Sequence, residues 1–139
     1  MWRYEISFAD SLKIIDGDTI IINKEKIRFS GIDTPELKQT CFKDNKIFFC
    51  GEFAKMILVK KIGKQIPKCI KEGKDIYKRT LAECFVKGES LSVFLVRSGY
   101  AFAYRKYSDK FIKDEEFAKK NKIGMWSMTF LYPWDFRNK

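Results

Sequence analysis

The first third of the chain carries three short runs of β-branched and apolar residues, separated by residues that favour turns. Runs of this length, divided by Asp, Gly and Asn, are typical of strands joined by tight turns. This part of the chain is therefore predicted to be β-structure. The predicted strands are residues 12–15, 19–22 and 27–32, and the turns are residues 16–18 and 23–26.

A polar stretch and then helical periodicity follow these strands. Residues 37–49 are polar and rich in lysine, so we expect a surface loop there. From Phe49 to Ile57 the apolar residues recur at helical spacing, which predicts a helix. Gly63 is the residue expected to end it.

The second half of the chain predicts two further strands and two further helices. Ser90 and Ser108 are placed to cap the helices, which Gly99 and Gly124 would end. The strands are residues 66–70 and 80–86. Five strands, interrupted by a helix after the third, suit an α+β chain with a mainly β core: a five-stranded OB-fold Greek-key barrel with about three helices.

Composition limits both the size of the fold and its partners. The chain has 139 residues, of which 45% are hydrophobic, and this suits a single domain over residues 1–139. No apolar run is long enough for a membrane span. The net charge of +10 favours polyanionic partners, either nucleic acid or an anionic membrane. A basic protein without such a partner is the alternative.

The chain contains no histidine. This excludes Ser–His and Cys–His nucleophilic catalysis and histidine-ligated zinc. Any catalysis must therefore use carboxylates, lysines, arginines, tyrosines, thiols or a metal held by oxygen atoms.

Carboxylates are concentrated at the ends of two predicted strands. Asp16 and Asp18 flank the first turn, and Asp33 and Glu36 follow the third strand. If the fold brings these strand ends together, their charges repel one another unless a cation lies between them. Oxygen ligands of this kind suit Ca²⁺ or Mg²⁺. Alternatively, the first pair belongs only to a hairpin turn and the second only to the start of a loop.

Two arginines lie close to these carboxylates in the predicted fold. Arg28 is on the strand that leads to Asp33, and Arg79 stands at the start of the fifth strand. A guanidinium can bind a phosphate through two parallel donors. Arginines beside a carboxylate-bound metal are typical of phosphodiester cleavage. The alternative is that each arginine is an ordinary surface charge.

The sequence resembles the staphylococcal nuclease (thermonuclease) family in five stretches that occur in the family's order. The first two stretches together are the most specific. The five stretches are residues 14–20 (IIDGDTI), 27–36 (IRFSGIDTPE), 77–82 (YKRTLA), 95–101 (LVRSGYA) and 118–127 (AKKNKIGMWS). The resemblance implies an OB-fold and Ca²⁺-dependent hydrolysis of DNA and RNA with little sequence preference.

The resemblance also implies roles for individual residues. Asp18 and Asp33 match the metal-binding carboxylates, and Thr34 matches the residue whose backbone carbonyl completes the metal site. Glu36 matches the carboxylate that handles the attacking water. The two arginines that match the family's phosphate-binding pair are Arg28 and Arg79.

The nucleotide-binding positions match less completely. Tyr77 and, with looser alignment, Tyr104 match tyrosines beside the nucleotide, and Lys78 is adjacent to the first of these. The family usually has a basic residue where this chain has Ile76, and glycine where it has Lys78. A lysine that replaces a glycine of positive φ carries a conformational cost, so this turn could be reshaped.

Two functional hypotheses fit this pattern. The first is an active nuclease that acts on DNA and RNA as a monomer, without an obligate protein partner. The second is a catalytically inactive nucleic-acid-binding OB-fold module. Such modules typically lose the carboxylates or arginines, whereas this chain retains all five catalytic positions, which favours the enzyme.

Four cysteines allow two disulfides in three pairings. Cys41 and Cys50 bracket the polar loop, and Cys69 and Cys84 lie on strands expected to be neighbours, so we expect bonds within these two pairs. Two disulfides indicate a secreted or periplasmic protein, and four reduced thiols are the alternative. The cysteines and the ending Pro133–Arg137 resemble an exported bacterial branch of the family. The N-terminus lacks the apolar core of a signal peptide, so an exported protein is expected to be in its mature or a trimmed form.

Overall fold

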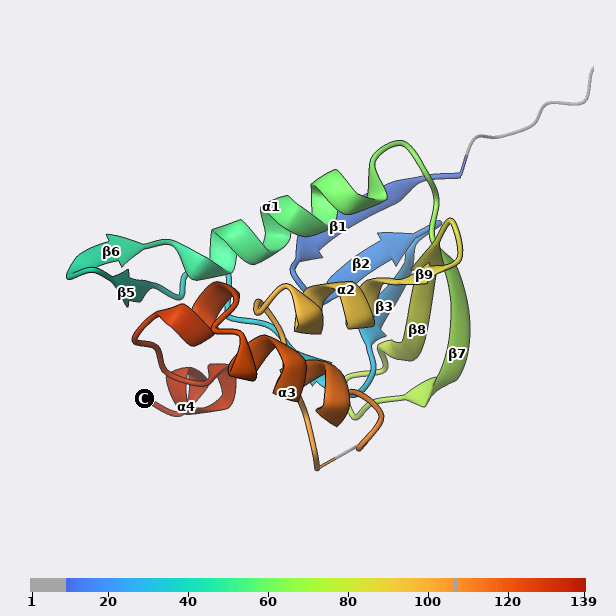
Figure 1. The fold of residues 1–139 in the computed structure, drawn as a ribbon. Coiled ribbons are helices and arrows are strands. Elements are labelled where there is room, and N and C mark those ends of the chain that lie inside the picture. Colours follow the sequence, from blue (N-terminus) through green and yellow to red (C-terminus); the bar gives the residue numbers. More distant parts are fainter. Residues whose placement is uncertain (1–9, 107) are drawn as a thin grey trace, which may run out of the picture.

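The three N-terminal runs form consecutive antiparallel strands, as their spacing predicts (Figure 1). The computed structural model describes residues 10–106 and 108–139. Ile20 pairs with Ile14 on one side and with Ile27 on the other, so these side chains share one face of the sheet. The strands are β1 (Leu12–Asp16), β2 (Thr19–Ile22) and β3 (Glu25–Phe29).

Two longer strands from the middle of the chain extend this sheet. Strand β8 (Thr80–Val86) pairs in parallel with β3 and antiparallel with β7 (Lys68–Lys74). The short β9 (Glu89–Ser90) also pairs with β8. The prediction for residues 80–86 is confirmed at both ends, whereas the strand predicted at 66–70 begins later and continues to residue 74.

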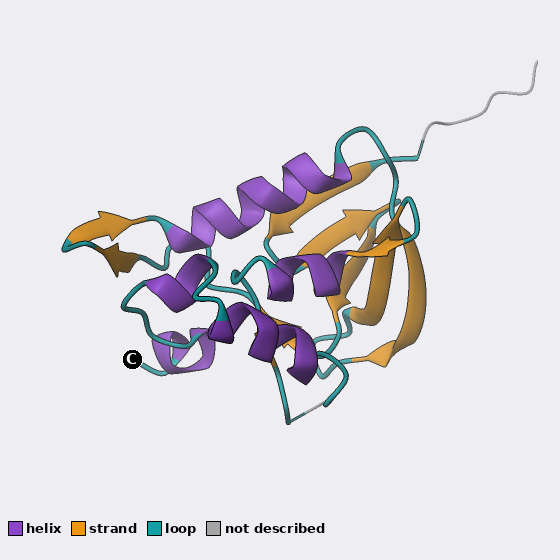
Figure 2. Ribbon diagram, in the orientation of Figure 1, coloured by secondary structure: helices purple, strands orange, loops and turns teal. Residues whose placement is uncertain are grey.

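The prediction of an α+β chain with a mainly β core is confirmed, but the main sheet is open among the described residues, so the predicted five-stranded barrel is wrong. Among the described residues the strand order is β1-β2-β3-β8-β7, which leaves β1 and β7 at the two edges (Figure 2). Most side chains of β7 are exposed, and its pairing with β8 is irregular between Lys71 and Gly73. Exposed charges and an irregular register are typical of an edge strand that pairs no further.

Short strands replace two parts of the sequence prediction. The run predicted as one strand at 27–32 is divided at Gly31, whose φ is +74°, and β4 (Ile32–Asp33) then pairs with β10 (Phe102–Ala103). The loop predicted at 37–49 contains a hairpin instead. Its two-residue turn, Asp44-Asn45, has φ values of +52° and +62°, which suit a tight hairpin. The strands of this hairpin are β5 (Cys41–Lys43) and β6 (Lys46–Phe48).

The described residues form four α-helices, where about three were predicted. Ser90 caps α2 by accepting a hydrogen bond from the Val93 N–H, as predicted. Ser108 does not cap α3, because that helix begins four residues later. None of the helices among the described residues is long and apolar enough to cross a membrane. The helices are α1 (Cys50–Ile62), α2 (Leu91–Arg97), α3 (Ile112–Lys120) and α4 (Pro133–Arg137), with a 3₁₀ turn at Gly124–Ser127.

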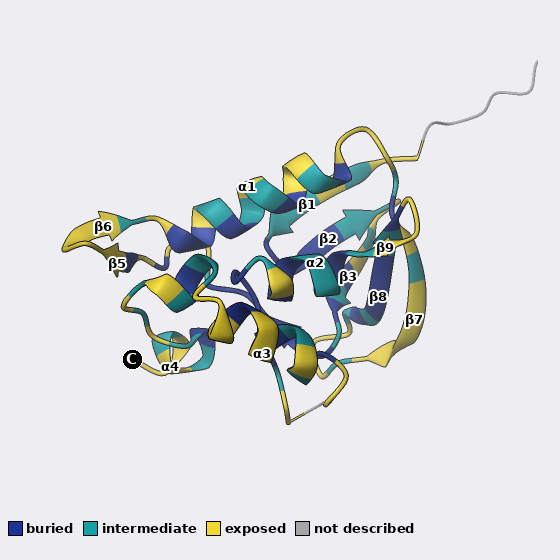
Figure 3. Ribbon diagram, in the orientation of Figure 1, coloured by how far each residue is buried: buried dark blue, intermediate teal, exposed yellow. Residues whose placement is uncertain are grey.

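Two packed clusters hold these elements together (Figure 3). The larger cluster fills the space between the sheet, α1 and α2, with Phe29, Leu58 and Leu95 fully buried. The smaller cluster contains Phe102 and combines aromatic rings of the C-terminal segment with residues of the hairpin and α1, including Cys41, Cys50 and Ala54. Because Phe102 pairs with Asp33, this second cluster holds α4 next to β4.

Both predicted disulfides are confirmed. Cys41 of β5 is bonded to Cys50, the first residue of α1, so the hairpin is fixed to the start of the helix. Cys69 and Cys84 stand opposite each other on β7 and β8 and are bonded across the strands.

Candidate active site

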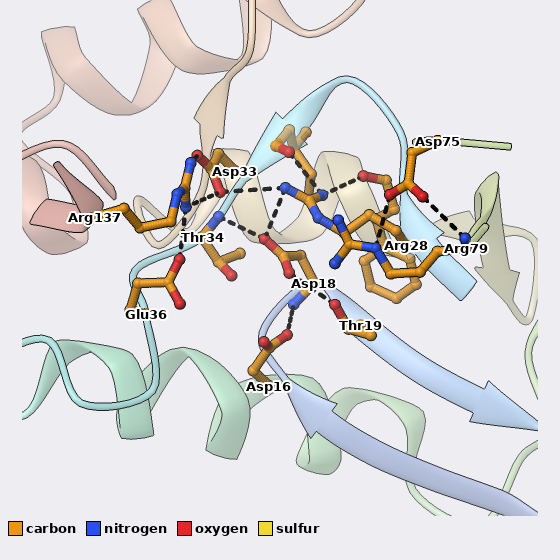
Figure 4. Close-up of polar contacts among 12 residues, drawn as sticks. Asp16, Asp18, Thr19, Arg28, Asp33, Thr34, Glu36, Asp75, Arg79 and Arg137 are labelled. Carbon is orange, nitrogen blue, oxygen red and sulfur yellow. Dashed lines mark hydrogen bonds and ion pairs between the residues drawn. The ribbon is translucent and has the colours of Figure 1, made fainter. Parts of the chain in front are cut away.

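Asp18 is the buried carboxylate at the turn between β1 and β2 (Figure 4). The turn is kept tight because the Asp18 N–H donates to Asp16 Oδ1 at 3.0 Å. The Thr34 N–H donates to Asp18 Oδ2 at 2.9 Å, and the Thr19 hydroxyl donates to Asp18 Oδ1 at 3.2 Å. These contacts orient the carboxylate toward the segment that follows β4.

Arg28 joins Asp18 to the second buried carboxylate, Asp33. One of its terminal nitrogens, Nη2, lies 3.3 Å from Asp18 Oδ2 and 3.2 Å from Asp33 Oδ1. The other, Nη1, donates to the carbonyls of Phe29 and Ile32 at 2.6 and 2.9 Å. The structure therefore brings together the two carboxylates that the sequence placed on different strands, and Arg28 compensates their charge.

Glu36 lies at the exposed rim of this cluster, and its backbone is closely held. Its N–H donates to the side-chain carbonyl of buried Gln39 at 3.1 Å, and its carbonyl accepts from the Gln39 N–H at 2.7 Å. Gly51, in the first turn of α1, packs directly against the Glu36 carbonyl. Gln39 was not predicted from the sequence, because a lone glutamine in a polar stretch carries no periodic signal.

Arg137 is the site residue that sequence reasoning did not assign. It is the last residue of α4, and its Nη2 lies 2.6 Å from Asp33 Oδ2. Its Nη1 lies 2.6 Å from Glu36 Oε1 and 3.2 Å from Asp33 Oδ1. The only sequence signal was the ending Pro133–Arg137, which gave no indication of contact with the carboxylates.

Arg79 approaches the cluster from the start of β8. Asp75 Oδ2 accepts from its Nε at 2.7 Å, and Asp75 Oδ1 accepts from the backbone N–H groups of Arg79 and Tyr77, both at 2.9 Å. In the part of the chain that the structure describes, neither Nη atom of Arg79 has a hydrogen-bond partner. In Figure 4 this side chain extends toward Arg28.

The predicted nucleotide-contact residues lie in two places. Tyr77 is 73% exposed beside Arg79, and their contact is of the cation–π type. Lys78 has a φ of +64°, so it adopts the left-handed conformation that favours the glycine expected at this position. Tyr104 lies elsewhere and stacks on Trp134 of α4, with ring centroids 5.5 Å apart.

The environment shifts the pKa values of the carboxyl groups in different directions. Burial and the charge of Asp18 raise the pKa of Asp16 to about 7. For Asp18, burial is outweighed by the Arg28 charge and the Thr34 N–H, and the pKa is lowered. Burial raises the pKa of Asp33 despite its hydrogen bonds from Arg137. The cluster therefore contains carboxyl groups of unequal acidity, as is common at functional sites.

The donor chemistry suits a hard cation. Asp18 and Asp33 supply buried carboxylate oxygens on either side of one guanidinium nitrogen, and oxygen ligands of this kind suit a hard cation. Within residues 10–106 and 108–139, however, no three acidic, histidine or cysteine side chains converge as a ready-made metal site. The third carboxylate of the cluster, Glu36, is turned toward Arg137 instead.

Comparison with known proteins agrees with this geometry. The model of the family described as "Staphylococcal nuclease homologue" matches residues 26–128. The chain belongs to this family. The match includes Arg28, Asp33, Glu36 and Arg79, but it ends before α4 and so does not include Arg137.

Several curated relatives are similar to most of this nuclease-family chain. An "Uncharacterized endonuclease" of Haemophilus influenzae is 31% identical over 84% of the chain. Proteins named "Thermonuclease" from Staphylococcus intermedius and Staphylococcus hyicus are each 32% identical, over 82% and 84% of the chain. The chain spans 64% of the length of the Haemophilus protein and 73% of each thermonuclease.

Proposed function

We propose that the protein is a Ca²⁺-dependent phosphodiesterase that hydrolyses DNA and RNA with little sequence preference. The observation that carries this proposal is the cluster of Asp18 and Asp33 around Arg28, with Glu36 and Arg79 at its accessible rim. A phosphodiester placed there meets an acidic centre on one side and, on the other, the Arg79 guanidinium, whose Nη atoms have no partner among the described residues. Membership of the staphylococcal nuclease family supports the same chemistry.

The chain's own groups divide the work of phosphodiester hydrolysis. Asp18, Asp33 and the backbone carbonyl of Thr34 would hold Ca²⁺, which supplies Lewis-acid polarisation of a phosphate oxygen. Glu36 orients the attacking water and accepts its proton as the new P–O bond forms. The opposite P–O ester bond breaks, and the leaving oxygen takes a proton from solvent. The free Nη atoms of Arg79 donate to the nonbridging oxygens, whose negative charge grows in the transition state.

Arg28 has a second task that the sequence did not predict. Both of its Nη atoms are already engaged by carboxylates and backbone carbonyls. We therefore propose that Arg28 holds Asp18 and Asp33 close together. To contact a phosphate, Arg28 must give up one of its present hydrogen bonds. Arg79, whose Nη atoms are free, is the better placed of the two for initial phosphate binding.

The positive charge and the aromatic side chains account for the proposed lack of sequence preference. A net charge of +10 attracts the phosphate backbone irrespective of sequence. Exposed Tyr77 offers a ring face to bases, and stacking on a ring tolerates any base. Tyr104, which stacks on Trp134, is the second proposed nucleotide-contact residue. Lys78 adds a charge beside Tyr77. We propose that the protein acts as a monomer and, because it has two disulfides, in a secreted or periplasmic setting.

The proposal is tested by digestion of plasmid DNA, a single-stranded oligonucleotide and an RNA, each in Ca²⁺, in Mg²⁺ and in excess EGTA. We expect cleavage of all three substrates in Ca²⁺, none in EGTA and little in Mg²⁺. The irregular oxygen shell offered here suits Ca²⁺, whereas Mg²⁺ requires a near-octahedral one. Retention of the substrates on the protein without cleavage would instead support the inactive binding module. Equal rates in calcium-free Mg²⁺ would contradict the Ca²⁺ assignment.

A further inference from the structure

The side chain of Arg137 reaches the carboxylate cluster from α4, which lies outside the residues that the nuclease family model matches. It contacts two carboxylates at once, Asp33 and Glu36, each at 2.6 Å. In the part of the chain that the structure describes, the Glu36 carboxylate has no other partner. The orientation of this carboxylate therefore depends on a residue at the far end of the chain.

We propose that Arg137 is a positioning residue that holds the Glu36 carboxylate against Asp33, so that Glu36 is aimed at the water it activates. The inference rests on the proposed nuclease function and deepens it, because it states what orients the group that handles the water. Arg137 is a positioning residue rather than a catalytic one, since it acts through Glu36.

The anchoring of α4 supports this role. Trp134, on the same helix, stacks on Tyr132 and Tyr104, with ring centroids 4.8 and 5.5 Å apart. The Phe102 ring packs edge-on against Trp134. Because Phe102 pairs with Asp33 across β10 and β4, the aromatic cluster and the acidic cluster are parts of one rigid unit. An arginine on a helix anchored in this way can fix a carboxylate in a way that a residue on a loose terminus cannot.

Charge gives the proposal a second consequence. Three carboxylates, those of Asp18, Asp33 and Glu36, are in contact with only two guanidinium groups. If Arg137 is removed, the net charge of the cluster becomes more negative by one unit. The cluster should then bind a divalent cation more tightly. The same change frees Glu36 and should slow the reaction. A change that merely damages the fold would weaken both properties together.

The experiment compares Arg137→Ala and Arg137→Lys with Arg97→Ala as the matched control. Arg97 is also a partly exposed arginine with a carboxylate partner, Asp114, and it stacks on Phe117. For each protein, kcat and KM are measured on a single-stranded oligonucleotide in Ca²⁺. The Kd for Ca²⁺ is measured by calorimetry without substrate, and unfolding is followed in urea.

We expect Arg137→Ala to lower kcat by about tenfold to a hundredfold with little change in KM, because the reacting group is misplaced. The same variant should bind Ca²⁺ at least about threefold more tightly, because a nearby positive charge is gone. Arg137→Lys should keep the wild-type Ca²⁺ affinity, because lysine retains the positive charge. It should recover only part of kcat, because lysine lacks the two parallel donors of a guanidinium. In a Glu36→Gln background, Arg137→Ala should cost nothing further in kcat. Arg97→Ala should match the wild type in kcat and Ca²⁺ affinity.

Three results would overturn the assignment. An unchanged kcat in a folded Arg137→Ala protein would show that Glu36 needs no such support. Parallel losses of kcat, Ca²⁺ affinity and urea resistance would indicate a purely structural role. Full additivity with Glu36→Gln would show that the two residues act independently. A wild-type chain that cleaves nothing in Ca²⁺ would instead overturn the proposed function, and the role of Arg137 in it.

Discussion

Gly51→Ala tests whether the start of α1 fixes the position of Glu36. A Cβ atom built at Gly51 would lie far inside van der Waals contact with the Glu36 carbonyl oxygen. It would also lie 2.8 Å from both the Glu36 carbonyl carbon and the Leu37 oxygen. All three atoms belong to the backbone, which cannot rotate away as a flexible side chain can. The segment that carries Glu36 must therefore move.

The size of the effect follows from this crowding. To restore normal contact the Glu36 backbone must shift by more than about 1 Å. A misplacement of about 1 Å can already cost about a hundredfold in rate. Overpacking at a buried contact costs about 1–3 kcal/mol of stability. The helix propensity of alanine alone would raise stability by up to about 1 kcal/mol over glycine. The sign of the stability change therefore distinguishes the contact from simple propensity.

Urea unfolding and single-turnover cleavage of a labelled oligonucleotide in Ca²⁺ measure the two effects. Met56→Ala is the matched control, because Met56 lies on the same helix and is half exposed, away from Glu36. It should change stability by less than about 0.5 kcal/mol in addition to its propensity effect, and it should leave the rate unchanged. A Gly51→Ala protein that is more stable than the wild type and equally active would refute the reasoning.

Two further predictions concern the phosphate arginine and the disulfides. Arg79→Lys should slow cleavage by about a hundredfold at saturating Ca²⁺, because lysine cannot offer two parallel donors to the phosphate; a folded variant with near-parental kcat would exclude this role. Serine replacement of either cysteine pair should cost about 3 kcal/mol in urea unfolding under the chain-entropy model, since both bonds close short loops. Replacement of Cys41 and Cys50 should also lower kcat, because their bond fixes the start of α1, whereas replacement of Cys69 and Cys84 should not. An equal fall in kcat in both variants would contradict this.

Strands of the sheet could be predicted where the buried positions are occupied by apolar residues. The strand Thr80–Val86 has the bounds predicted from its apolar residues, and the N-terminal runs form strands in the predicted order. The hairpin of β5 and β6 was missed because its strands are three residues long and carry lysines on exposed positions. Its only local signal was Asp44-Asn45, a pair that tolerates positive φ.

Closure of the sheet and the contacts of Arg137 could not be predicted for a different reason. Whether β1 and β7 meet depends on the curvature of the whole sheet, which no short pattern encodes. Arg137 reaches Asp33 across 104 positions of the chain, through a five-residue helix that is held by aromatic packing. The pairing of the cysteines was predictable because each pair lies within one hairpin-like unit.

Glu36→Gln provides the most direct test of a nuclease built on this carboxylate cluster. Glutamine has nearly the same shape and can still accept a hydrogen bond from Arg137, but it cannot take a proton from water. In Ca²⁺ the single-turnover cleavage rate should fall by at least about a hundredfold, the usual contribution of a positioned base. The Kd for a single-stranded oligonucleotide, measured by fluorescence anisotropy in EGTA, should stay within about threefold of the wild type, because Glu36 makes no attractive contact with phosphate. A folded Glu36→Gln protein that cleaves at the parental rate, or that loses binding in proportion to rate, would contradict the account.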